Sequence, residues 1–88
     1  MADRVVGLPG ERLSIVNGVV HIGDVPLSEP YVAGENRWSG DLGPIQLGRD
    51  EYFVLGDNRR NSSDSREWGP VARSDIQARF SVVWWRRK

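Results

Sequence analysis

Apolar and polar residues alternate along much of this chain, with the period of two that is typical of β-strands. The clearest case runs from residue 13 to residue 22, where Asn17-Gly18 separates two alternating segments. Asn-Gly is a strong signal for a two-residue hairpin turn, because a type I′ turn needs two positive φ angles. The resulting pairing gives one wholly apolar face, made of Leu13, Ile15, Val20 and Ile22. We expect a hairpin with a fixed register, and with His21 on the opposite, polar face.

Shorter patterns predict the remaining elements. Residues 25–27 suit a short edge strand that tolerates Pro26. Residues 33–44 are rich in glycine and predict a mobile loop, and residues 51–55 predict a strand. Ser74 predicts the N-cap of a short helical turn. Alternation over residues 78–85 predicts a last strand, whose inward face comprises Ala78, Phe80, Val82 and Trp84. No window has a convincing period of about 3.6 residues, so the sequence predicts an all-β fold.

The segment GDNRRNSSDSREWG, at residues 56–69, is the strongest candidate for a functional loop. It has no aliphatic side chain, and it pairs acids with bases at short spacing, Asp57 with Arg59 and Asp64 with Arg66. The apolar run before it predicts a strand that delivers the loop to a fixed place. Polar residues on a rigidly held loop are typical of binding and catalysis. The alternative is a solvated, hydrogen-bonded turn.

A second segment, RVVGLPGE at residues 4–11, adds a family resemblance. Together the two segments resemble the C-terminal sequence boxes of bacterial type I signal peptidases, which are membrane-anchored serine endopeptidases with a Ser/Lys dyad. The family pattern reads Lys-Arg-x-x-Gly-Leu-Pro-Gly-Asp/Glu and then Gly-Asp-Asn-Arg-x-Asn-Ser-x-Asp-Ser-Arg-x-Trp/Phe-Gly. Glu29-Pro30-Tyr31 also resembles the family, and the resemblance extends from Arg4 to about Trp85.

The resemblance implies a signal-peptidase-type fold of coiled, mostly antiparallel sheets that is incomplete at its N-terminal side. Residues 1–88 would form a single domain, the C-terminal part of a catalytic domain, with residues 12–48 as a smaller β insertion. The parent protein would cleave signal peptides from exported preproteins. Its catalytic domain would lie at the outer face of the bacterial cytoplasmic membrane.

The resemblance also assigns roles to residues. It implies that Arg4 and Asp57 form a salt bridge between the two boxes, and that Asp64 and Arg66 form an ion pair that braces the loop. Ser62 matches the serine whose hydroxyl holds the catalytic Lys. Hydroxyls in this loop also satisfy backbone groups, and we expect this of Ser63 and Ser65. Tight turns and positive φ angles explain a further set of positions: Gly7, Pro9, Gly10, Gly56 and Gly69.

Two departures from the family pattern concern the reacting groups. Asp3 stands where the family has its general-base Lys, and Lys88 is the only lysine. The family's nucleophilic Ser lies upstream, in a Ser-Met-x-Pro context, whereas the only methionine here is Met1. We therefore expect this chain to have no catalytic residue of its own and to be inactive alone.

Composition narrows the function classes. Twelve basic and twelve acidic side chains balance, which argues against nucleic-acid binding. Cysteine is absent, His21 is expected at the surface, and arginines flank Asp57 and Asp64, so we expect no metal and no cofactor. No apolar run approaches the roughly 20 residues of a membrane span, so we expect a soluble chain whose anchor lies elsewhere.

Two further hypotheses concern partners. The alternative to a peptidase part is a non-catalytic β module that binds extended peptides, or that touches the membrane surface through residues 84–88. An unpaired strand edge beside residues 4–6 would also favour a homo-oligomer, because exposed edges pair with other chains.

Overall fold

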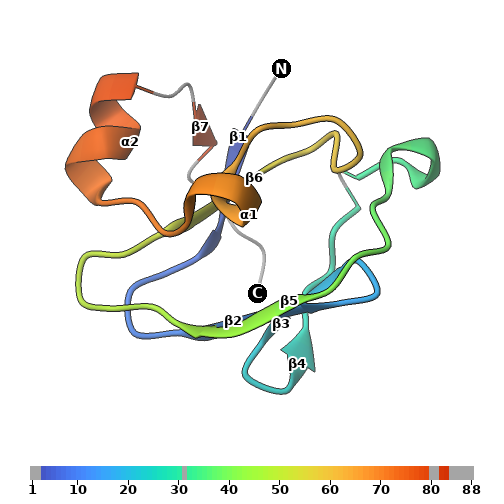
Figure 1. The fold of residues 1–88 in the computed structure, drawn as a ribbon, viewed down its shortest axis with the longest axis horizontal. Coiled ribbons are helices and arrows are strands. Elements are labelled where there is room, and N and C mark those ends of the chain that lie inside the picture. The colour runs from blue at the N-terminus through green and yellow to red at the C-terminus, as the bar shows by residue number, and fades with distance from the viewer. Residues whose placement is uncertain (1–2, 31, 80–81, 84–88) are drawn as a thin grey trace.

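The protein folds into two small β-sheets with two short helices at one side, as seen in a computed structural model that describes residues 3–30, 32–79 and 82–83 (Figure 1). The strands are β1 (Asp3–Gly7), β2 (Arg12–Val16), β3 (Val19–Ile22), β4 (Val25–Pro26), β5 (Leu42–Gln46), β6 (Phe53–Gly56) and β7 (Val82–Val83); a 3-10 turn, η1, covers Gly34–Asn36, and the helices are α1 (Ser65–Trp68) and α2 (Arg73–Arg79). One sheet has the order β6-β1-β7, and the other has the order β4-β3-β2-β5. Most strand pairs are antiparallel, as the sequence predicts.

The hairpin of β2 and β3 has the predicted register. Leu13 pairs with Ile22 and Ile15 with Val20, and Asn17 has a positive φ of 49° in the turn. Gly18 follows with a φ of 79°. The predicted apolar face is the inner one, and β4 adds to the edge of β3 as expected.

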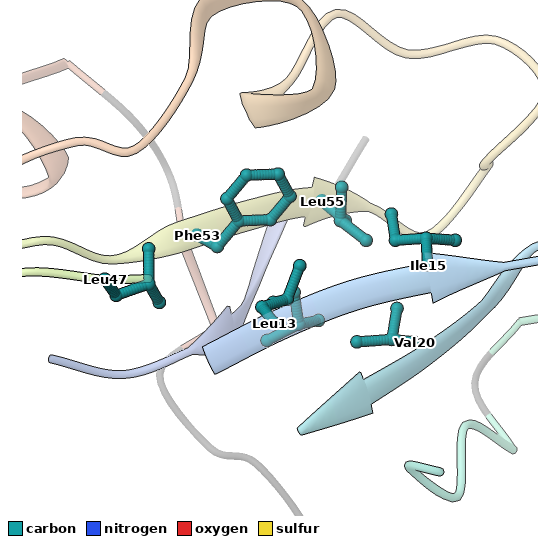
Figure 2. Packing of buried hydrophobic residues seen from close by; sticks show 7 residues of the cluster. Leu13, Ile15, Val20, Leu47, Phe53 and Leu55 are labelled. Carbon is teal, nitrogen blue, oxygen red and sulfur yellow. The ribbon is translucent and has the colours of Figure 1, made fainter. Parts of the chain in front are cut away.

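The two sheets share one apolar core (Figure 2). Its buried members come from both sheets and from the segment after β5: Val6, Leu13, Ile15, Val20, Leu47, Phe53 and Leu55. The opposite face of β6 is covered as well, because Val54 packs with Val5, Tyr52 and Ile76 of α2. Since β6 is buried on both faces, it gives the loop that follows it a rigid starting point.

Several predictions about single elements were wrong. Residues 33–44 contain η1 and the start of β5, which pairs with β2, rather than one loop. Ser74 lies inside α2 and is not its N-cap, and Ala78 is helical rather than part of a strand. Seven residues are too few to show a helical period, and Ile76 is the residue of α2 that is buried at 1% exposure. Val82 does lie in a strand, whereas Phe80 and residues 84–88 lie outside the described residues.

The predicted free edge beside β1 is also corrected. β1 lies between its two neighbours: it pairs antiparallel with β6 and parallel with β7 at Asp3 and Arg4. The sequence suggested an edge because the family completes this sheet with upstream strands. Here the C-terminal part of the chain returns to cover it, so the premise of self-association fails at Asp3 and Arg4.

Candidate functional site

The two sequence boxes meet where β1 and β6 pair. Asp3 lies opposite Gly56, and Arg4 lies opposite Leu55. Arg4 reaches past the end of β6 to Asp57: its Nε donates to Oδ1 and its Nη2 to Oδ2, both at 3.0 Å. The two side chains are 12% and 25% exposed. This two-pronged contact joins segments that are 53 residues apart, and it fixes orientation as well as distance.

Asp64 is the centre of the loop and is fully buried. Its carboxylate accepts hydrogen bonds from the Gly56 amide (3.1 Å), the Ser62 hydroxyl (2.7 Å), and the backbone amide, Nε and Nη2 of Arg66 (3.1, 2.9 and 2.8 Å). Burial alone would raise the pKa of Asp64, but the bonds from Arg66, Ser62 and Gly56 outweigh burial and hold the pKa below its usual value. The resulting stabilisation is present above the usual pKa of an aspartate and is lost as the pH falls through the lowered pKa.

Ser62 is held in one orientation by its neighbours. Its hydroxyl donates to Asp64 and accepts from Arg66 Nη2 at 2.9 Å. A serine oxygen can accept two hydrogen bonds, so one acceptor position remains. A Cβ atom placed on Gly56 would lie 2.7 Å from Ser62 Oγ and 3.3 Å from Asp3 Oδ1. The Ser62 hydroxyl and the residue 3 side chain therefore both lie close to the same glycine, and a side chain on residue 56 would clash with Ser62.

The surroundings of Asp3 disfavour a negative charge. Burial raises the pKa of the Asp3 carboxyl, and the nearby negative charges of Asp64 and Asp57 raise it further. An ammonium group at this position would be attracted by the same two carboxylates. Burial disfavours a charge of either sign at this position, whereas the two carboxylates disfavour a negative charge in particular.

Side chains of the loop also close the outer edge of β6. Val54 donates its amide to Ser65 Oγ at 2.9 Å, and Gly56 donates its amide to Asp64. Ser65 therefore satisfies a backbone group, as predicted. Ser63 does not, because its hydroxyl lies between Trp68 Nε1 and Glu67 Oε2 at 3.3 Å each. Asp64 is also the N-cap of α1, a helix that the sequence analysis did not predict.

Two contacts of this loop were missed. Arg59 is 4% exposed, and it pairs with Glu29 at 2.7 Å rather than with Asp57, while its Nε donates to the Gly56 carbonyl at 2.7 Å. The Arg66 guanidinium lies 4.8 Å from the centre of the Trp38 ring. The partners Glu29 and Trp38 belong to residues 12–48, so the spacing of residues within the loop could not predict these contacts. Glu29 alone was noted, through the family resemblance.

The glycines divide into two kinds. Gly10 and Gly69 have positive φ angles of 82° and 81°, as expected for turns. Gly7 and Gly56 are instead needed for space: a Cβ on Gly7 would lie 2.7 Å from a Leu47 methyl group, and one on Gly56 would lie 2.6 Å from Ser62 Cβ. Gly56 thereby permits the close approach of β6 and the loop.

Other candidate chemistry is separate from this loop. His21 lies in β3, half-buried, with Nδ1 3.0 Å from the Val19 carbonyl oxygen. Within residues 3–30, 32–79 and 82–83, no group of three or more His, Cys, Asp or Glu side chains is placed to hold a metal ion. Neither described helix is long and apolar enough to cross a bilayer.

Comparison with known proteins identifies the family. The family model described as signal peptidase, peptidase S26, matches residues 2–85. A probable signal peptidase I-2 of Synechocystis sp. is 39% identical over 82 residues, which are 93% of this chain and 37% of that protein. Signal peptidase I of Leptolyngbya laminosa is 43% identical over 84 residues, which are 93% of this chain and 39% of that protein.

A solved structure agrees with the sequence comparison. The crystal structure of a signal peptidase I from Enterococcus faecalis V583 superimposes with a TM-score of 0.69 at 31% identity, and the match covers 82% of this chain and 74% of that one. The chain spans less than half the length of the Synechocystis and Leptolyngbya relatives. The mostly antiparallel sheets, the two sequence boxes and the family match agree: this chain belongs to the signal peptidase family, peptidase S26.

Proposed function

We propose that this chain is the C-terminal part of a signal peptidase catalytic domain, and that it supplies the loop that would support a basic residue at position 3, where this chain has Asp3. The whole protein would cleave signal peptides from exported preproteins at the outer face of the cytoplasmic membrane, as the family resemblance implies. One observation carries the proposal: the Ser62 hydroxyl and the residue 3 side chain both lie close to Gly56.

The chemistry of a lysine base explains the surrounding bonds. Such a lysine takes a proton from a hydroxyl nucleophile only in its neutral form. Burial at position 3 would favour that form, and the charges of Asp57 and Asp64 would oppose it. Asp64 and Arg66 orient Ser62, and the Arg4–Asp57 pair fixes β1 against the loop. These contacts would hold Ser62 and β1 in place beside a basic side chain, although position 3 carries a carboxylate.

We expect the 88-residue chain alone not to hydrolyse a signal-peptide substrate. Its sequence contains no Ser-Met-x-Pro segment, so a carboxylate at position 3 has no nucleophilic serine of that segment to activate. The assay would use a fluorogenic peptide with an Ala-x-Ala site, and rates should equal the buffer background. Asp3→Lys alone should restore nothing, for the same reason. Turnover above background that Ser62→Ala abolishes would contradict this expectation.

The support role is tested by stability rather than by turnover. Asp3→Lys should raise the free energy of unfolding by about 0.5–1 kcal/mol, because it replaces like-charge repulsion from Asp57 and Asp64 with attraction that water partly screens. Asp50→Lys is the control, since it makes the same charge change at an exposed turn. Urea unfolding measures both. An Asp3→Lys variant no more stable than the Asp50→Lys variant would refute a cation site at position 3.

A further inference from the structure

We propose that Glu29 and Trp38, both in the 12–48 segment, are positioning residues for the support loop, defined here as residues 56–66. Each of them holds one arginine of that loop, and the two arginines in turn hold Gly56, Ser62 and Asp64. The inference rests on the proposed function, because it concerns the placement of Ser62 against position 3.

The first contact is a buried ion pair. Arg59 Nη2 lies 2.7 Å from Glu29 Oε2, and the side chains are 4% and 11% exposed. The same guanidinium donates from Nε to the Gly56 carbonyl oxygen at 2.7 Å. An arginine fork that is satisfied on both sides has one orientation. Glu29 therefore fixes the position of Arg59. Arg59 in turn fixes the orientation of the Gly56 carbonyl, and Gly56 lies opposite Asp3.

The second contact is a stacked pair. The Arg66 Cζ atom lies 4.8 Å from the centre of the Trp38 ring, a distance at which a cation is attracted to an aromatic face. Arg66 uses its donors on Asp64, on the Ser62 hydroxyl and, through Nη1, on the Arg59 carbonyl at 2.7 Å. The ring thus restrains a side chain that contacts Asp64, Ser62 and the Arg59 carbonyl.

A cavity beside this pair makes the Trp38 ring important for restraining Arg66. A cavity of about 320 Å³ adjoins the contact, lined by Trp38, Arg59, Arg60, Ser62, Arg66 and Glu67. Because the cavity leaves Arg66 unpacked on one side, removing the ring would leave the guanidinium held only along its edge, by the hydrogen bonds to Asp64, Ser62 and the Arg59 carbonyl. Loss of Trp38 should therefore let Arg66 and Ser62 move together.

Amide hydrogen exchange followed by NMR distinguishes positioning from general stabilisation. The Gly56 amide reports on the loop because it donates to Asp64, whereas the amides of β2 and β3 report on the other sheet. Glu29→Gln and Trp38→Leu should each speed exchange at Gly56 at least tenfold and leave the β2 and β3 amides within twofold. Glu35→Gln, an exposed carboxylate in the same segment, is the control for the first variant. Trp38→Phe keeps a ring face and should restore most of the protection.

A carboxyl titration by NMR gives a second signature. If the loop moves away from β1, the pKa of Asp3 should fall towards its ordinary value in Glu29→Gln and Trp38→Leu, because both burial and the Asp64 charge raise it now. Equal acceleration of Gly56 and of the β2 and β3 amides, or loss of all protection, would overturn the inference, since the contacts would then only stabilise the fold. The inference would also be overturned if the exchange rate of the Gly56 amide in both variants stayed within twofold of its rate in the unmodified chain. The Asp3→Lys comparison tests the proposed function separately, because it depends on neither Glu29 nor Trp38.

Discussion

Replacing Asp64 by alanine is expected to lower the free energy of unfolding by about 3–5 kcal/mol, which is typical for breaking a buried ion pair. The carboxylate is fully buried and accepts five hydrogen bonds from Gly56, Ser62 and Arg66. Its removal leaves the buried Gly56 amide without an acceptor and the largely buried Arg66 guanidinium without its carboxylate, and each of these losses is costly.

Urea unfolding followed by tryptophan fluorescence would measure this change. Asp24→Ala is the matched control, because it removes an exposed carboxylate from the turn between β3 and β4 and should alter stability by less than about 0.5 kcal/mol. The free energy of unfolding of Asp64→Asn should lie between those of the two alanine variants, since asparagine keeps the shape of the side chain and loses its charge. Equal midpoints for Asp64→Ala and Asp24→Ala would show that the network does not stabilise the loop.

Phe53→Ala is expected to destabilise the protein to a similar extent, by about 3–5 kcal/mol, through the cavity that it leaves. Phe53 is fully buried in the cluster that joins the two sheets (Figure 2). Small domains have about 5–15 kcal/mol of stability in total. A domain at the low end of that range would lose most of its stability, and the loop after β6 would unfold with it.

Thermal denaturation followed by circular dichroism would test this expectation. Val25→Ala is the control, because Val25 is 65% exposed and its truncation creates no cavity. A melting temperature of Phe53→Ala within about 2 °C of the Val25→Ala value would mean that the two sheets do not depend on this contact.

The parts of the fold that depend on neighbours in sequence were predictable. The Asn17-Gly18 turn and the alternation around it determine which residues of β2 and β3 pair, so the register followed from local rules. The helix α2 was not predictable in the same way. It is short, its first turn was misread as a cap at Ser74, and its packing against β6 depends on a contact distant in sequence.

The candidate site shows the same division. The residues of the loop were found because they match a family motif, and the Arg4–Asp57 and Asp64–Arg66 pairs are present. Short spacing suggested Asp57 as the partner of Arg59, yet Arg59 pairs with Glu29, 30 residues away. Sequence spacing can suggest only partners that are close along the chain. The fold brings the Glu29 carboxylate, from the 12–48 segment, to Arg59. A buried guanidinium needs such a partner, because an unpaired buried charge is costly.

The closure of β6 by Ser65 and Asp64 has a consequence for aggregation. The outer strand of a sheet is a template on which foreign chains can extend the sheet, and proteins protect such strands by occupying or blocking them. Here the amides of Val54 and Gly56 are already bonded to side chains of the adjoining loop. An intermolecular strand could bind there only by displacing Asp64, and with it the orientation of Ser62. The bonds that organise the candidate site therefore also keep this strand from recruiting other molecules, and acid conditions that protonate Asp64 would weaken both functions together.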